Sequence, residues 1–153
     1  MTPELPEYLR RIKYPDRILR PTRHERIGLA TSPDLGDWRR HPAGPLLDNG
    51  PEGAWDSRFV VDPWVVGTGW RWHMFYYGFD GEHAREGVAL SENLVQWEKS
   101  PWNPILDVGE AGSIDSRHAH KPCVIEHGGT WYHFYVAVDE TERCVALATS
   151  QPV

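Results

Sequence analysis

Apolar and polar residues alternate along the chain in short runs that glycine and proline interrupt. Two long runs of β-branched and aromatic residues flank a Gly-Thr-Gly turn at 67–69, and shorter apolar runs follow a polar loop at 79–86. No segment sustains the 3.6-residue period of a helix, and only residues 3–12 could form a turn or two. The pattern therefore predicts an all-β protein with strands at 58–66, 70–78, 87–91 and 96–99.

The chain repeats itself at an offset of 59 residues. Residues 26–78 pair with residues 85–137 without a gap, and 21 of the 53 pairs are identical. A third copy begins at 145–150, where VALATS follows the pattern of GVALS at 87–91. Four short antiparallel strands in each copy form the blade unit of a β-propeller. Tryptophans that recur between the copies, such as Trp38 and Trp97, are expected to pack between blades.

The repeat divides the chain into an N-terminal arm at 1–25 and a partial propeller at 26–153. The propeller part holds half of one blade, a whole blade at 58–99 and a partial blade at 117–150. Propellers have about four to eight blades, so this chain forms an incomplete ring. We expect it to self-associate through its open edges or to be the C-terminal part of a longer protein.

Composition narrows the range of partners. The formal charge of −6 argues against nucleic acid and anionic membranes, although six basic residues gather between Arg10 and Arg23. No apolar run approaches the roughly 20 residues of a membrane span, and the first residues do not resemble a signal peptide. Cys123 and Cys144 have no metal-binding spacing and lie in apolar stretches, so buried free thiols in a cytoplasmic protein are expected.

The first strand of each blade lines the central channel of a propeller, which makes its residues the candidates for chemistry. Residues that are identical in both copies favour a scaffold role, and residues that differ favour function. Among the pairs that differ at this strand are Phe59 and His118, Val61 and His120, and Asp62 and Lys121. Pro63 follows Asp62 in mid-strand and removes a ladder donor, so the strand is expected either to be distorted there or to face the channel rather than a neighbouring strand on that side.

Hydrolysis of a glycosidic bond commonly needs two carboxylates about 5 to 9.5 Å apart. The catalytic candidates are Asp62, Glu110 and Asp115, although a loop glutamate such as Glu110 is more often only solvated, and Asp115 has an identical partner in Asp56. His118 and His120 share one face of a regular strand, but no third ligand has a suitable spacing for a metal. We therefore expect no metal and no cofactor. The substrate-binding candidates are Arg58, Trp64, Arg117, His118, His120 and Lys121.

These motifs resemble the five-bladed β-propeller glycosidases of glycoside hydrolase families 43, 32, 62, 117 and 130. The resemblance is carried by VVDPWVV at 60–66, WHMFYYG at 72–78, GVALSENLVQWEK at 87–99 and NPIL at 103–106. It implies that the chain corresponds to the C-terminal blades of such an enzyme. Members of this group take a base Asp, an Asp that tunes the acid and an acid Glu from successive blades. Asp62 matches the Asp-Pro position of one blade, and Lys121 replaces that Asp in the next.

Three functions remain open at this point. The chain could act on a carbohydrate as an O-glycosyl hydrolase, bind a carbohydrate without catalysis, or serve as a truncated or self-assembling fragment without activity. The carboxylates that line the channel discriminate between them: two within reach of each other favour an enzyme, and none favours binding.

Overall fold

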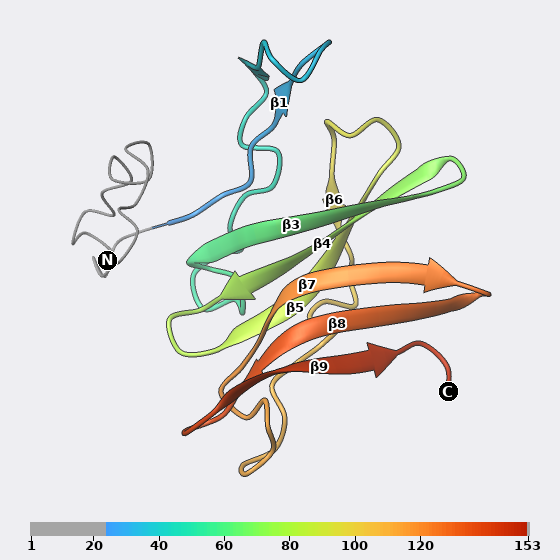
Figure 1. Ribbon diagram of the computed structural model, residues 1–153. Coiled ribbons are helices and arrows are strands. Elements are labelled where there is room, and N and C mark those ends of the chain that lie inside the picture. The colour runs from blue at the N-terminus through green and yellow to red at the C-terminus, as the bar shows by residue number, and fades with distance from the viewer. Residues whose placement is uncertain (1–23, 153) are drawn as a thin grey trace, which may run out of the picture.

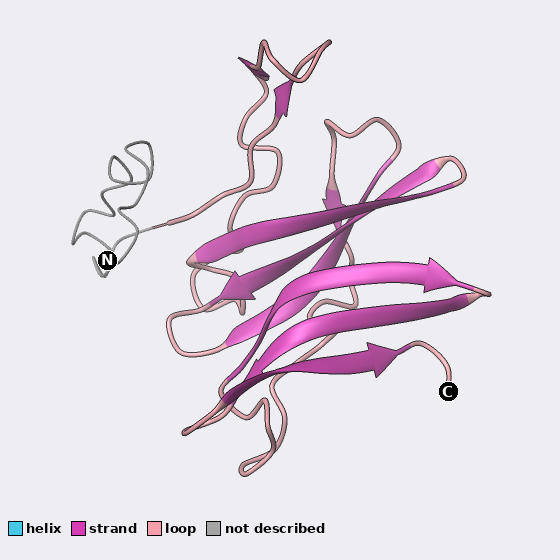
Figure 2. Cartoon of the chain, in the orientation of Figure 1, coloured by secondary structure: helices cyan, strands magenta, loops and turns pink. Residues whose placement is uncertain are grey.

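The computed structural model describes residues 24–152, and within that range it contains strands and loops but no helix (Figures 1 and 2). This confirms the all-β class. The predicted helical turn at 3–12 and the basic cluster between Arg10 and Arg23 lie outside the described residues. No helix in the described range could cross a membrane.

The central blade contains four strands, β3 (Phe59–Thr68), β4 (Arg71–Phe79), β5 (Ala84–Ser91) and β6 (Glu98–Lys99). Each strand pairs antiparallel with the next in the order β3-β4-β5-β6. Strand β5 starts three residues before the expected run at 87–91. A tight turn ends the preceding loop early, because the Asp80 carboxylate accepts hydrogen bonds from the backbone N–H groups of Glu82 and His83.

The last blade contains three strands within the described residues, β7 (His118–His127), β8 (Thr130–Val138) and β9 (Arg143–Thr149). They pair antiparallel in that order. One parallel bridge, Ala84 with His118, joins the two blades, which lie beside each other in Figure 1. Side chains rather than a hydrogen-bonded ladder therefore hold the blades together.

Residues 24–50 form the half blade that precedes β3. Strands β1 (Ala30–Thr31) and β2 (Arg39–Arg40) form a small hairpin that projects away from the large sheet (Figure 1). Its register, Ala30 with Arg40 and Thr31 with Arg39, is that of β5 with β6 shifted by one repeat. The half blade thus supplies the third and fourth strands of its unit.

Backbone irregularities recur with the sequence repeat. A bulge between Val61 and Trp64 in β3 has its counterpart between His120 and Cys123 in β7. Asp62 and Lys121 lie in these bulges with positive φ angles of 49° and 63°. The distortion expected from Pro63 is therefore present, and it recurs at Pro122. An extra residue in one strand bends that strand and turns its side chain away from the regular alternation.

The two large blades differ in the sizes of three residues at corresponding positions, and the differences compensate for one another. The Trp55 ring lies against Gly78 and Gly87, and a methyl group added at these glycines would approach the ring to within 2.6 and 2.7 Å. The next blade carries Ile114, Ala137 and Ala146 at the corresponding positions. A smaller side chain at the first position thus accompanies larger ones at the other two, which preserves the filled volume.

The tryptophans and cysteines are less uniformly buried than their sequence pattern suggests. Trp97 packs against the core cluster of the central blade, and the Trp131 ring contacts His73 and Phe75 across the blade boundary. Both cysteines are free; Cys123 is half-buried and Cys144 is exposed on β9. The expectation that both thiols are buried is wrong for Cys144, because among residues 24–152 no strand covers the outer edge of β9.

Candidate functional site

Asp62 lines a pocket between the half blade and the central blade. The pocket has a volume of about 300 Å³ and is lined by Glu25, Arg26, Ile27, Gly28, Val61, Asp62, Pro63 and Tyr77. The bulge exposes the Asp62 side chain instead of placing it in the core. Aspartate tolerates the left-handed backbone region better than most residues, and positive φ angles outside glycine concentrate at functional sites.

Burial and the carboxylates of Asp62 and Glu25 raise the pKa of the Tyr77 hydroxyl in this pocket. Burial, followed by the negative charges of Asp62 and then Glu25, raises the pKa of Tyr77 to about 12. Tyr77 is therefore a neutral hydrogen-bond donor at physiological pH. A phenol and two carboxylates on one pocket offer donor and acceptor groups of the kind that sugar hydroxyls bind.

The row of polar side chains continues onto the last blade through His120. The His120 ring meets the Tyr77 ring edge-on with a centroid distance of 5.4 Å, and it lies 6.0 Å from the His118 ring. His120 is only 8% exposed, and its Nδ1 has no hydrogen-bond partner among the described residues. His118 Nδ1 accepts a hydrogen bond of 3.1 Å from the Ala84 N–H. We call Asp62, Tyr77, His118, His120 and Lys121 the inner cluster.

Both histidines of the inner cluster favour the neutral form. Burial, followed by the positive charges of His118, Lys121 and Arg143, lowers the pKa of His120 to about 4. Burial, followed by the charge of Arg117, also lowers the pKa of His118. At neutral pH these rings are therefore uncharged.

His120→Val should make the protein less sensitive to acid. Between pH 6.5 and about 4 the unfolded protein takes up a proton at His120 that the folded protein does not, so wild-type stability falls as the pH falls through this window. Valine, the residue at the matching position 61, removes that contribution. Urea unfolding at pH 7 and pH 5 should show a loss smaller by up to about 2 kcal/mol in the variant. The exposed His127→Thr is the control, and an equal loss in all three proteins would contradict the assignment.

Trp64 and Lys121 lie on neighbouring strands beside this row. The Trp64 indole N–H donates a 2.7 Å hydrogen bond to the Val124 carbonyl and so ties β3 to β7. Its side chain is still partly exposed. Lys121 is exposed in its own bulge, at the position that Asp62 occupies one blade earlier.

Arg58 and Arg117 support the blade hairpins. The Arg58 guanidinium lies against Gly81 in the β4–β5 turn, where a methyl group would come within 3.0 Å of its Nε. Arg117 forms a 2.9 Å ion pair with Glu140, which occupies the same position in the β8–β9 turn. This geometry fits the scaffold interpretation of residues that the two copies share.

Asp115 and Glu110 are not part of the pocket that Asp62 lines. Asp115 accepts hydrogen bonds from the Tyr135 hydroxyl at 2.8 Å and from the Ser113 hydroxyl at 3.0 Å. Glu110 is exposed in a loop, where its carbonyl oxygen accepts hydrogen bonds from Ser113. The structure therefore does not bring the three catalytic candidates together.

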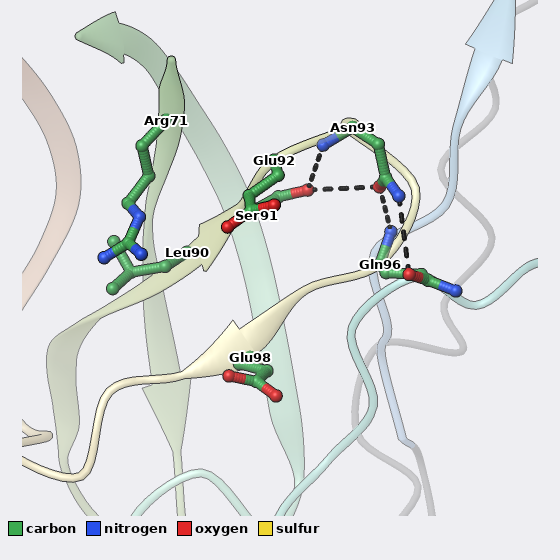
Figure 3. Close-up of a pocket in the computed structure, with 7 residues that line it drawn as sticks. All are labelled: Arg71, Leu90, Ser91, Glu92, Asn93, Gln96 and Glu98. Atoms are coloured by element: carbon green, nitrogen blue, oxygen red, sulfur yellow. Dashed lines mark hydrogen bonds between the residues drawn. The ribbon is translucent and has the colours of Figure 1, made fainter. Parts of the chain in front are cut away.

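A second, polar pocket lies at the turn between β5 and β6 (Figure 3). The Ser91 hydroxyl, the Asn93 amide and Gln96 bond to one another and to the local backbone around it. Ser32 and Asp34 form the same turn one repeat earlier. Because the turn recurs with the repeat, we assign it to the scaffold. No group of three or more His, Cys, Asp or Glu within residues 24–152 is arranged to hold a metal ion.

Glu25 and Tyr77 were missed by the sequence reasoning, although a signal for both was present. Tyr77 corresponds to Val136 in the next copy of the repeat, so the two copies differ at this position as they do at Asp62. Glu25 corresponds to Ala84 in the next copy and lies one residue before the compared segment 26–78. Only the fold shows that these departures meet in one pocket.

Comparison with solved structures identifies the same architecture in larger proteins. A glycoside hydrolase is 33% identical over 84% of this chain with a TM-score of 0.69. BT0996, in a complex with RGII, is 32% identical over 83% of the sequence, also with a TM-score of 0.69. The family 117 glycoside hydrolase Zg3597 of the marine bacterium Zobellia galactanivorans is 20% identical over 81% of the sequence, with a TM-score of 0.71.

Comparison of the sequence alone gives no match to a protein-family model or to a curated protein. The chain spans only about 36% of the length of the first two structural relatives. It is therefore built as a partial propeller of the five-bladed glycoside hydrolase type.

Proposed function

We propose that this protein binds carbohydrate on the inner cluster and the adjoining Asp62 pocket. The observation that carries this proposal is the concentration of repeat-breaking polar residues on one surface, from Asp62 through Tyr77 to His120. By contrast, Arg58 and Arg117 keep the same structural task in the two blades. Two structural relatives are glycoside hydrolases by name, and a third, BT0996, forms a complex with RGII, which supports a carbohydrate as the ligand class.

Three members of the inner cluster and the neighbouring Trp64 have a role in this proposal. Asp62 accepts hydrogen bonds from sugar hydroxyls, and neutral Tyr77 donates one. Lys121 supplies a cation for a carboxylate of an acidic sugar. The exposed face of Trp64 offers an apolar surface for a sugar ring.

Asp62→Asn should weaken oligosaccharide binding about tenfold, because hydrogen bonds to a charged group contribute about 1.5–3 kcal/mol. Isothermal titration against a panel of neutral and acidic oligosaccharides measures the affinity. Asp37→Asn is the matched control, since Asp37 is exposed in the β1–β2 turn and away from β3. Binding that is equal in both variants, or no binding to any member of the panel, would refute the site.

Hydrolysis is the second candidate, and the presence of Glu25 and Asp62 on one pocket favours it. One carboxylic acid would protonate the leaving oxygen while the other carboxylate activates water. Release of reducing ends from a bound oligosaccharide, lost in both Glu25→Gln and Asp62→Asn, separates hydrolysis from binding alone.

A further inference from the structure

The outer edge of β9 is an open position for a fourth strand. In the central blade, β6 occupies that position on β5 through the pairs Ala89 with Lys99 and Leu90 with Glu98. The matching residues of β9 are Ala148 and Thr149, and no strand within residues 24–152 pairs with them on that side. Val145 and Leu147 on β9 are 71% and 47% exposed. Exposed apolar edge strands are templates for pairing with another polypeptide.

The central blade shows what a fourth strand contributes. Trp97 packs against a core cluster that includes Met74 and Ala89. The Lys99 ammonium lies 2.5 Å from the carboxylate of Asp56, whose side chain is only 3% exposed. A tryptophan and, two residues later, a cation thus close the blade.

The last blade has residues at the positions that contact the tryptophan and the cation in the central blade. A pocket of about 340 Å³ lies between the blades, and its lining includes His133 and Ala148, the counterparts of Met74 and Ala89. Asp115, the counterpart of Asp56, is bonded to Tyr135 and Ser113 but has no cation partner among the described residues. The edge therefore fits a strand with an aromatic residue followed by a basic one.

The hairpin at 30–40 has this pattern in Trp38, Arg39 and Arg40. Trp38 is 58% exposed, and both arginines of β2 are exposed. The ladder between β1 and β2 has two residue pairs, flanked by a hydrogen bond from the His41 N–H to the Leu29 carbonyl, and the hairpin stands away from the large sheet (Figure 1). The turn that precedes Trp38 is already formed, because the indole N–H donates to the Leu35 carbonyl at 3.0 Å, as Trp97 does to Leu94.

We propose that β2 of a second copy of this protein binds the outer edge of β9. Arg40 would pair with Ala148 and Arg39 with Thr149, in the register of β6 on β5. Trp38 enters the pocket between the blades, and the Arg40 guanidinium meets the Asp115 carboxylate. In this arrangement β2 leaves β1 of the donor copy, while residues 25–28 of the donor stay beside its own β3. Because donor and acceptor surfaces differ, the contact is head-to-tail.

Charge reversal across this contact tests the proposal in solution. The wild-type protein of 17.6 kDa should show concentration-dependent association by sedimentation equilibrium. Arg40→Asp and Asp115→Lys should each weaken it at least tenfold, and the double variant should recover it. An equimolar mixture of the two single variants should also recover association, because both contacts between unlike variants have matching charges and only the contacts between identical variants do not.

Trp38→Ala provides a second donor variant on the exposed hairpin, so the test stands even if circular dichroism shows that Asp115→Lys misfolds. A strictly monomeric wild type would overturn the proposal, whether β9 is then covered by another protein or by a further segment. Association that survives both Arg40→Asp and Trp38→Ala would also overturn it, since the copies would then meet through another surface.

Discussion

Replacing His133 with Met should lower the free energy of unfolding by about 3–5 kcal/mol, because Glu86 is then left as an uncompensated buried carboxyl. Glu86 is fully buried, and its Oε2 bonds to His133 Nε2 across the boundary between the two large blades. Burial raises the pKa of Glu86, while the bond to His133 opposes that shift. Its Oε1 has no partner within the described residues, so His133 carries most of the compensation.

The preceding blade boundary supplies the matched control. Ile27 and Met74 occupy the corresponding positions there and belong to one apolar cluster. The double variant Glu86→Ile/His133→Met should therefore be as stable as the wild type or more stable, by up to about 4 kcal/mol. Urea unfolding followed by tryptophan fluorescence gives the four free energies of the cycle. Strictly additive effects would show that the two side chains are not coupled.

Gly78→Ala should destabilise the protein by about 3 kcal/mol through overpacking. The added methyl carbon would lie 2.4 Å from Asp56 Cβ, 2.6 Å from the Trp55 ring and 2.9 Å from Asp56 Cα. The last contact is with backbone, so a rotamer change cannot relieve it. The loss is measured as a shift of the urea midpoint.

The next blade shows how this clash is avoided. The triple variant Trp55→Ile/Gly78→Ala/Gly87→Ala copies its residues Ile114, Ala137 and Ala146 into the central blade. We expect it to be more stable than Gly78→Ala, because Trp55→Ile removes the contact with the ring while the approach to Asp56 remains. A triple variant less stable than Gly78→Ala itself would show that the three positions do not form one packing unit.

The repeat made most of the fold predictable. An offset without gaps determines where strands, turns and bulges recur, and hairpin pairing then follows from the turn residues. The distorted strand at Asp62 was predicted because Pro63 cannot donate to a ladder. The exposure of Cys144 was not predicted, since apolar residues on an uncovered edge strand have the same sequence pattern as buried ones.

The candidate site was predictable only in part. The departures at Asp62, His118, His120 and Lys121 marked the strands that carry it, but a linear comparison does not show which departures meet in space. Tyr77 comes from the second strand of its blade and Glu25 from the half blade. The exchange of Ile27 and Met74 for Glu86 and His133 is also visible as two separate differences, and only the structure shows that they touch.

A crystal structure of the protein with the tightest-binding oligosaccharide shows directly where the sugar binds. We expect a sugar ring against Asp62 and Tyr77, between residues 25–28 and β3, with further units extending toward His120 and Lys121. A sugar bound instead at the polar pocket around Arg71 and Ser91, with the inner cluster empty, would contradict it.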